Sequence, residues 1–365
     1  MKRTFLILCA TTIMSSLIAQ NSQVPVKGIK WYGHDSFLTE GTTFTDSVKE
    51  NLYDRFPVSY KNKVREPVWN LSKCSAGISI RFLSNTSQIS VKWEVLNDMK
   101  MNHMAETGIK GIDLYYWNGN NWQYVNTARP SGKINEFLLI ANMKPEKREY
   151  KMYLPLYDGI TSLEIGIDSS GIFEKSSRSS KKPVVFYGTS ITQGGCASRP
   201  GMLHSSILSR KLDVDCINFG FSGNGRMEQP VNELISGIDA MLYVIECAEN
   251  MSVEEIETNM IPLAERIRSR HPLTPIIFVD NLMYEKACLD ETTMNSVIVK
   301  NEAMKRVFDK MKGQGFSDIY FIEKNGAIGT DHEATVDGVH LTDLGFLRYA
   351  DFLIEKIHGF NLLLN

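Results

Sequence analysis

The sequence predicts a two-domain protein of the α/β class. A flavodoxin-like, three-layer α/β/α domain with a parallel sheet is preceded by an antiparallel β-sandwich of the jelly-roll type. Apolar residues recur at every second position up to about residue 168, whereas short apolar strands alternate with helical segments after residue 183. Between them, SSGIFEKSSRSSKK is rich in serine and charge, as is typical of a domain boundary. The expected divisions are a signal peptide at 1–19, a β-sandwich at 20–170, a linker at 171–182 and the α/β domain at 183–365.

The first segment has the pattern of a secretory signal. Lys2 and Arg3 precede an apolar stretch over residues 5–17, and Ala19 offers a small residue for cleavage. Polar residues interrupt this stretch, and a membrane span needs roughly 20 apolar residues. A lipoprotein anchored at Cys9 is not expected, because a leucine precedes that cysteine. We therefore expect an exported protein, periplasmic or extracellular, without stable membrane insertion.

Composition excludes several classes of partner. The formal net charge of -2 argues against nucleic acid, which requires a clearly basic face. The histidines, cysteines and carboxylates have no metal-ligand spacing, so no metal or other cofactor is expected. Five cysteines follow the signal; an odd number permits a disulfide without predicting one. Cys216 and Cys247 lie in apolar runs and are expected to be buried. The sequence does not indicate an oligomeric state.

The first domain consists of half-buried strands. Strands with alternating apolar residues are expected around residues 78–82, 89–95, 150–154 and 163–167. Residues 114–117 and 122–125 flank Asn118-Gly119-Asn120-Asn121, which predicts a hairpin.

The second domain reads as a parallel sheet covered by helices. Five short apolar strands are expected at residues 184–187, 215–219, 241–246, 275–279 and 319–323. Ser252 and Glu255 form a capping-box signature at the start of one intervening helix. In such sheets the functional residues gather beyond the carboxyl ends of the strands.

The first of these strands, VVFYG, leads directly to Ser190. A serine at a tight turn between a strand and a helix has an exposed hydroxyl and a free amide, which suit a nucleophile. A phosphate-binding loop is excluded because no Lys-Ser or Lys-Thr follows the glycines. The α/β-hydrolase elbow fits poorly, since Thr192 replaces its second glycine.

The next two strands end in candidate oxyanion donors. Residues 220–225 (GFSGNG) allow a close backbone approach, so the Gly223 amide is one candidate, although the loop alone is an ordinary turn. The side chain of Asn250 is the other, although alone it reads as a residue at a helix start.

Near the C-terminus, Asp337 precedes His340 by three residues with a glycine between them. This carboxylate can fold back to orient the imidazole, which predicts a base for Ser190. The rival pair Asp331-His332 remains open, but adjacent residues of an extended chain point apart. The other histidines are interpreted as structural or surface residues.

Together these four blocks resemble the SGNH (GDSL-type) hydrolase family over about residues 183–358. The resemblance implies that Ser190 is the nucleophile, that Ser190, Gly223 and Asn250 form the oxyanion hole, and that Asp337 and His340 are the acid–base pair. Two positions depart from the family pattern. Thr189 replaces the aspartate of the GDS sequence, and the third block reads Ala248-Glu249-Asn250-Met251 rather than G-x-N-D.

A second resemblance lies in the first domain. Gly111-Ile112-Asp113-Leu114-Tyr115 is similar to the GxDLY sequence of the β-sandwich that precedes some bacterial SGNH hydrolases. The arrangement is also similar to that of carbohydrate acetylesterases with an N-terminal jelly roll. A structural role is favoured for Asp113 and Tyr115 over contact with substrate.

The expected function is that of a secreted serine esterase, and specifically of a carbohydrate O-acetylesterase acting on a small-molecule or glycan ester. A lipid or lysophospholipid esterase is the alternative within the same chemistry. A non-catalytic carbohydrate-binding protein is the alternative from another class, but it would be favoured by loss of a triad residue, and all three are present.

Overall fold

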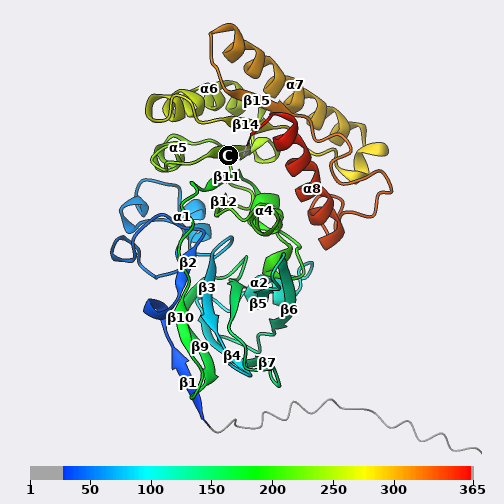
Figure 1. Cartoon of the computed structure of the whole chain (residues 1–365). Coiled ribbons are helices and arrows are strands. Elements are labelled where there is room, and N and C mark those ends of the chain that lie inside the picture. The colour runs from blue at the N-terminus through cyan, green and yellow to red at the C-terminus, as the bar shows by residue number, and fades with distance from the viewer. Residues whose placement is uncertain (1–27, 363–365) are drawn as a thin grey trace, which may run out of the picture.

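The structure is a computed structural model that describes residues 28–362; the expected signal peptide lies outside them. Figure 1 shows two halves, with an antiparallel part below and a parallel α/β part above. The two-domain fold class predicted from periodicity is confirmed. Within the described residues, none of the helices is both long and apolar enough to cross a bilayer.

The first half contains two antiparallel sheets. The order in one is β1 (Ile29–Tyr32), β9 (Ile160–Asp168), β4 (Ile89–Val95) and β7 (Ile134–Ile140). The order in the other is β10 (Phe173–Lys175), β3 (Ser79–Ser84), β8 (Arg148–Tyr153), β5 (Ile112–Trp117) and β6 (Trp122–Ala128), with β2 (Leu38–Glu40) also paired to β3. Two short helices, α1 (Glu66–Ser72) and α2 (Glu106–Lys110), lie in its loops.

Alternation along the strands builds the core of this sandwich. Ile80, Val91, Leu114 and Ile165 come from both sheets, are fully buried and belong to one apolar cluster. The expected hairpin is confirmed: β5 and β6 pair antiparallel, and the Asn118 N–H donates to the Asn121 carbonyl at 3.1 Å.

Three residues of the segment predicted as a linker form a strand instead. Strand β10 pairs antiparallel with β3. The Phe173 ring stacks on Tyr32 and on Phe82, with ring centroids 4.3 and 4.7 Å apart. Two aromatic contacts explain why a segment of polar composition is held on the sheet edge at this point.

The second half is a five-stranded parallel sheet in the order β12-β11-β13-β14-β15. This is the flavodoxin-like order, with strands numbered along the domain running 2-1-3-4-5. The strands are β11 (Val184–Gly188), β12 (Cys216–Gly220), β13 (Leu242–Glu246), β14 (Ile276–Val279) and β15 (Ile319–Ile322). Each lies within about one residue of its predicted range.

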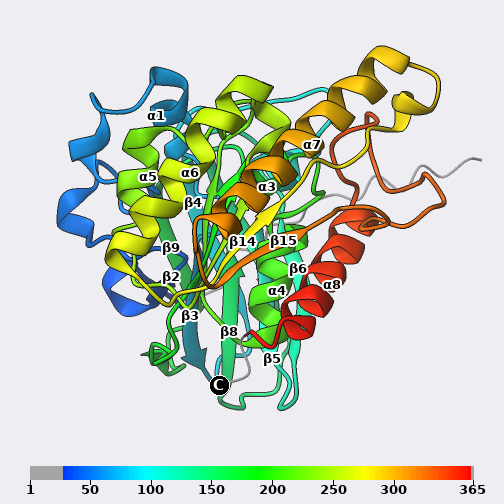
Figure 2. The same cartoon turned by 90° about the horizontal axis from the view of Figure 1, so that it is seen from above.

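Helices cover both faces of this sheet (Figures 1 and 2). Val185 and Tyr187 of β11 pack in one apolar cluster with residues of α5, α6 and α7, whereas Val184 and Phe186 pack in another with α4 and α8. The helices are α3 (Ser190–Gln193), α4 (His204–Leu212), α5 (Gln229–Ile235), α6 (Val253–Arg270), α7 (Glu291–Gly313) and α8 (Asp343–Gly359). The predicted capping box at α6 is confirmed, with Glu255 N–H donating to Ser252 Oγ and Ser252 N–H to Glu255 Oε2.

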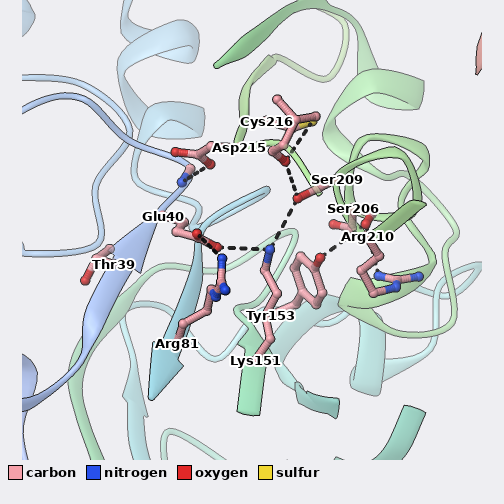
Figure 3. Close-up of polar contacts among 12 residues, drawn as sticks. Thr39, Glu40, Arg81, Lys151, Tyr153, Ser206, Ser209, Arg210, Asp215 and Cys216 are labelled. Atoms are coloured by element: carbon pink, nitrogen blue, oxygen red, sulfur yellow. Dashed lines mark hydrogen bonds and ion pairs between the residues drawn. The ribbon is translucent and has the colours of Figure 1, made fainter. Parts of the chain in front are cut away.

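Buried polar contacts join the two halves (Figure 3). Glu40 of β2 forms ion pairs of 3.0 Å with both Arg81 and Lys151 of the sandwich. Lys151 also donates to Ser209 Oγ of α4 at 3.3 Å, and the Gly41 N–H donates to Asp215 Oδ1 at 2.8 Å. The sandwich is therefore fastened to the base of β12 rather than loosely tethered.

Candidate active site

The register of the parallel sheet brings three predicted strand ends together. Gly188 of β11 pairs with Gly220 of β12 on one side and with Glu246 of β13 on the other. The Ser190 turn, the 220–225 loop and the segment leading to Asn250 therefore begin side by side. This is the edge at which a parallel α/β sheet presents its functional residues.

Ser190 and His340 lie in direct hydrogen-bond contact although 150 positions separate them. Ser190 Oγ is 2.8 Å from His340 Nε2, and His340 Nδ1 is 2.7 Å from Asp337 Oδ2. The serine begins α3, and the other two residues lie in the loop that precedes α8. The structure thus brings all three predicted residues into one continuous chain of hydrogen bonds, which is the geometry of an activated serine.

The local fold of the 337–340 loop sets the orientation of the histidine. Asp337 Oδ1 accepts the backbone N–H groups of Val339 and His340, at 3.1 and 2.8 Å. Gly338 has φ +85°, a conformation that favours glycine and lets the chain turn back so tightly. Burial alone would raise the pKa of Asp337, but hydrogen bonds from His340 lower it below the ordinary value. An ionised Asp337 accepts Nδ1–H, which leaves Nε2 free to accept the Ser190 proton.

The backbone amides of Ser190 and Gly223 are free to donate. Within residues 28–362, the N–H groups of Ser190 and Gly223 have no hydrogen-bond acceptor. Gly223 has φ +68°, and a Cβ placed on it would meet no atom within 4 Å, so its surroundings are open. Its neighbour Gly225 has no such room, because a Cβ there would lie 2.2 Å from the Gly188 carbonyl oxygen.

The side chain of Asn250 joins this group. It lies at the end of the short helix η5 (Ala248–Asn250), where its Oδ1 accepts the Gly225 N–H at 3.2 Å. With Oδ1 engaged in this way, Nδ2 remains as the donating atom. Ser190, Gly223 and Asn250 each carry a potential donor on segments that begin at adjacent strand ends, so they remain the candidates for an oxyanion site.

The sequence did not indicate the residues that hold the loop around Gly223 in place. Gln193, fully buried, accepts the Ser222 N–H at 3.0 Å and donates to the Leu156 carbonyl at 3.1 Å. Arg55 from the first half, also buried, donates to the carbonyls of Asn218 and Gly220 at 3.2 and 2.7 Å. The sandwich thus holds the loop that carries Gly223. No local sequence signal marks either residue, because their partners are distant in the chain.

A second group missed by the sequence lies beneath the nucleophile turn. Glu246, buried at the end of β13, accepts from Thr192 Oγ1 at 3.0 Å, from His204 Nε2 at 3.2 Å and from the Tyr349 hydroxyl. Burial alone would raise the pKa of Glu246, but His204, Lys324 and Tyr349 lower it to about 2. A fixed carboxylate here anchors the helix that begins with Ser190.

His103 is exposed, as expected of a structural or surface residue, and it lies beside the candidate base. Its ring centroid is 5.9 Å from that of His340, and it comes from the sandwich half. His103, Cys196 and His340 offer possible metal-ligand atoms within 4.8 Å of one another. His340 is already bonded to Ser190 and Asp337, and burial raises the pKa of the Cys196 thiol to about 12. We therefore assign no metal to this group.

The remaining candidates lie apart from Ser190. Asp331 pairs with Arg348 at 2.7 Å, and His332 bonds Glu285 at 2.8 Å, so the rival pair forms no contact of its own. Asp113 accepts from Arg199 at 2.8 Å. The Gly201 N–H donates to the same carboxylate at 2.7 Å, which makes Asp113 a contact between the halves.

All five cysteines in the described part of the chain are unpaired, and Cys216 and Cys247 are buried as predicted.

Comparisons with known proteins agree with this geometry. The sequence profile described as the GDSL-like lipase/acylhydrolase family matches residues 181–358. A solved structure from Bacteroides ovatus, assigned to the GDSL-like lipases, is 34% identical, with a TM-score of 0.87, 91% of this chain covered and 98% of that one. This chain belongs to the GDSL-like lipase/acylhydrolase family. It is an SGNH-type serine esterase, and the resemblance drawn from its four sequence blocks is confirmed.

The first half of this esterase has its own relatives. A profile for the N-terminus of SGNH-hydrolase-type esterases, named GxDLY, matches residues 29–173. The two-domain fold recurs in a salicylyl-acyltransferase from a tetracycline biosynthetic pathway, at 14% identity and a TM-score of 0.76, over 92% of this chain and 98% of that one. It recurs again in a family two carbohydrate esterase from Clostridium thermocellum, in complex with cellohexaose, at 12% identity and a TM-score of 0.59 over 78% and 93%. No curated protein matches the chain.

Proposed function

We propose that this esterase is a secreted carbohydrate O-acetylesterase that forms an acyl-enzyme on Ser190. The continuous hydrogen-bonded chain from Ser190 through His340 to Asp337 is the observation that carries the catalytic part of the proposal. Its support is geometric, because a serine and its base within 3 Å, with the base held by a carboxylate, need no rearrangement to react.

The first half-reaction acylates the serine. His340 Nε2 takes the proton of Ser190 Oγ as Oγ attacks the ester carbonyl, and Asp337 stabilises the imidazolium that forms. The N–H groups of Ser190 and Gly223, with Asn250 Nδ2, hold the negative oxygen; one such donor is typically worth about 3 kcal/mol. His340 then protonates the alcohol oxygen, and its bond to the acyl carbon breaks.

The second half-reaction releases the acid. Water gives a proton to His340 as its oxygen attacks the acyl carbon. The tetrahedral intermediate is held by the same three donors. When it collapses, the bond to Ser190 Oγ breaks, and the proton on His340 returns to the serine.

The substrate class is argued from features outside the catalytic groups. The predicted export, the sandwich partner and the fold shared with a carbohydrate esterase favour an acetylated glycan. A lipid ester is the second candidate, because the relative that is 34% identical is assigned to the lipases.

The test compares mature wild type with Ser190→Ala on p-nitrophenyl esters from acetyl to long acyl chains. We expect Ser190→Ala to lose activity by about 10⁴-fold or more, and Asn250→Ala to retain partial activity. Ser190-dependent turnover that is fastest on acetyl supports the proposal. Preference for long chains favours the lipid candidate, and equal turnover by Ser190→Ala contradicts the site assignment.

A further inference from the structure

A cavity of about 800 Å³ lies beside the proposed catalytic groups, in the size range of about 300–1,000 Å³ that is typical of ligand sites. It is open to the surface and is lined by residues at the ends of β14 and β15, in α7 and in the short helix η6 (Glu285–Cys288). These elements lie together on one side of the α/β half in Figures 1 and 2. Ser190, Asp337 and His340 do not line it.

Two residues that line the cavity contact the proposed catalytic segments. Lys324 lines the cavity and pairs at 2.6 Å with Glu249, the neighbour of Asn250. Glu285 also lines the cavity, and its N–H donates to the carbonyl of Gly338, between Asp337 and His340, at 3.0 Å. A ligand in the cavity would therefore lie against the walls of the active site rather than at a remote position.

The cavity is lined by two buried polar side chains that leave hydrogen-bonding atoms unused. Asp280 and Asn281 follow β14 and are 6% and 3% exposed. Within residues 28–362, the side-chain amide of Asn281 makes no hydrogen bond, and Asp280 uses only Oδ1, which accepts the Lys324 N–H at 2.7 Å. Burial raises the pKa of Asp280 to about 6. A buried polar atom without a hydrogen-bond partner lowers stability. A site that keeps such atoms is therefore suited to a ligand that supplies the missing partners.

The chemistry of the lining selects among ligands. Each hydroxyl of a sugar both donates and accepts, so neighbouring hydroxyls can satisfy a carboxylate and an amide together. Tyr284 and Phe321 supply apolar surface for the C–H face of a ring. An acyl chain would leave the buried Asn281 side-chain oxygen without a partner. The carboxylates on the wall, including Glu302 and Glu323, outnumber Lys305 and Lys324 and disfavour an anion.

We infer that this cavity is a subsite for a neutral sugar unit of the substrate. The inference rests on the proposed function, because it places the glycan of the ester beside the serine that removes its acetyl group. It also separates the glycan candidate from the lipid candidate on grounds independent of the fold comparisons.

The test has a cavity-filling variant and a matched control. Ile298 of α7 lines the cavity and is 37% exposed, so Ile298→Trp fills it from the surface. Val299, the next residue, is 44% exposed and lies outside the lining, so Val299→Trp adds the same ring elsewhere on the helix. Asn281→Ala removes the unpartnered amide but keeps both hydrogen bonds to Asn301, which involve the Asn281 main chain. Its stability should be unchanged or higher.

Binding of xylohexaose, cellohexaose and mannohexaose is measured calorimetrically, with and without these substitutions. We expect at least one hexaose to bind, Ile298→Trp and Asn281→Ala to weaken it tenfold or more, and Val299→Trp to stay within twofold. On acetylated xylo-oligosaccharides the same two variants should raise KM, while turnover of p-nitrophenyl acetate stays within twofold. Equal hexaose affinity in Ile298→Trp, or no hexaose binding by folded wild type, would overturn the inference. The proposed function fails separately, by Ser190-independent ester hydrolysis, and the hexaose titration does not depend on that result.

Discussion

At the scale of single residues, the arrangement of Asp337 and His340 is compact and local. The carboxylate receives two backbone N–H groups and the imidazole from a stretch of four residues. The serine, in contrast, arrives from another part of the chain. A motif of this kind can be recognised in a sequence, but its partner must be supplied by the fold.

Replacing Asp337 by Asn should lower kcat by about 10²–10⁴-fold, because the amide cannot hold His340 in the tautomer that leaves Nε2 unprotonated. Hydrolysis of p-nitrophenyl acetate across a range of pH measures the loss. The matched control is Asp331→Asn, in the same loop, whose carboxylate pairs with Arg348 instead. If Asp331→Asn proved the more damaging change, the carboxylate assignment would have to move.

At the residue scale, His103 is exposed as expected, but its position beside His340 could not be predicted. Nothing near it in the sequence distinguishes it from other surface histidines. It lies beside His340 only because the sandwich packs against the hydrolase half. Gln193, Arg55 and Glu246 were missed for the same reason.

At the scale of elements, local signals located the parallel strands and the start of α6. The five parallel strands were located by their apolar runs, since strands buried on both faces carry little polar sequence. The start of α6 was located by its capping box. The end of the sandwich was not located in this way, because aromatic stacking holds β10 on the sheet and the polar composition of the segment does not reveal it.

Removing the Ser252 hydroxyl should lower the free energy of unfolding by about 1 kcal/mol, since the Glu255 N–H at the helix start loses its acceptor. Denaturant unfolding followed by circular dichroism gives the value. Ser269→Ala, near the far end of the same helix, is the control and should change stability by a few tenths of a kcal/mol at most. Equal losses in the two variants would argue against a specific capping contribution.

At the scale of the whole molecule, the interface between the halves contains a carboxyl group with an unusual titration. Burial, and then the nearby charge of Glu40, raise the pKa of Asp215 to about 6, although Lys151, the Gly41 N–H and Arg178 oppose the shift. The unfolded chain titrates near 3.9. Between about pH 4 and 6 the folded protein therefore holds a proton that the unfolded chain has lost. The stabilisation that protonated Asp215 gives the folded state is complete below pH 4 and is lost as the pH rises through 6.

Asp215→Asn should remove the fall in unfolding free energy that follows deprotonation of Asp215. Its Oδ1 can still accept the Gly41 N–H, so the variant should gain stability over wild type by on the order of 1–3 kcal/mol between pH 4 and pH 8. Unfolding by denaturant at intervals across this range, with the difference taken at each pH, cancels the titration of other groups. A difference that does not change with pH would contradict the prediction.

The sequence by itself determined the local features: the two periodicities, the strand ends, the Ser190 turn and the Asp337-His340 loop. Each depends on residues within a few positions of one another, so each leaves a pattern that can be read. Only the tertiary structure decided which strand ends meet, that Arg55 and Gln193 brace the Gly223 loop, and that Asp280 and Asn281 line a cavity beside it. These contacts join residues far apart in the chain, where sequence spacing carries no information about distance.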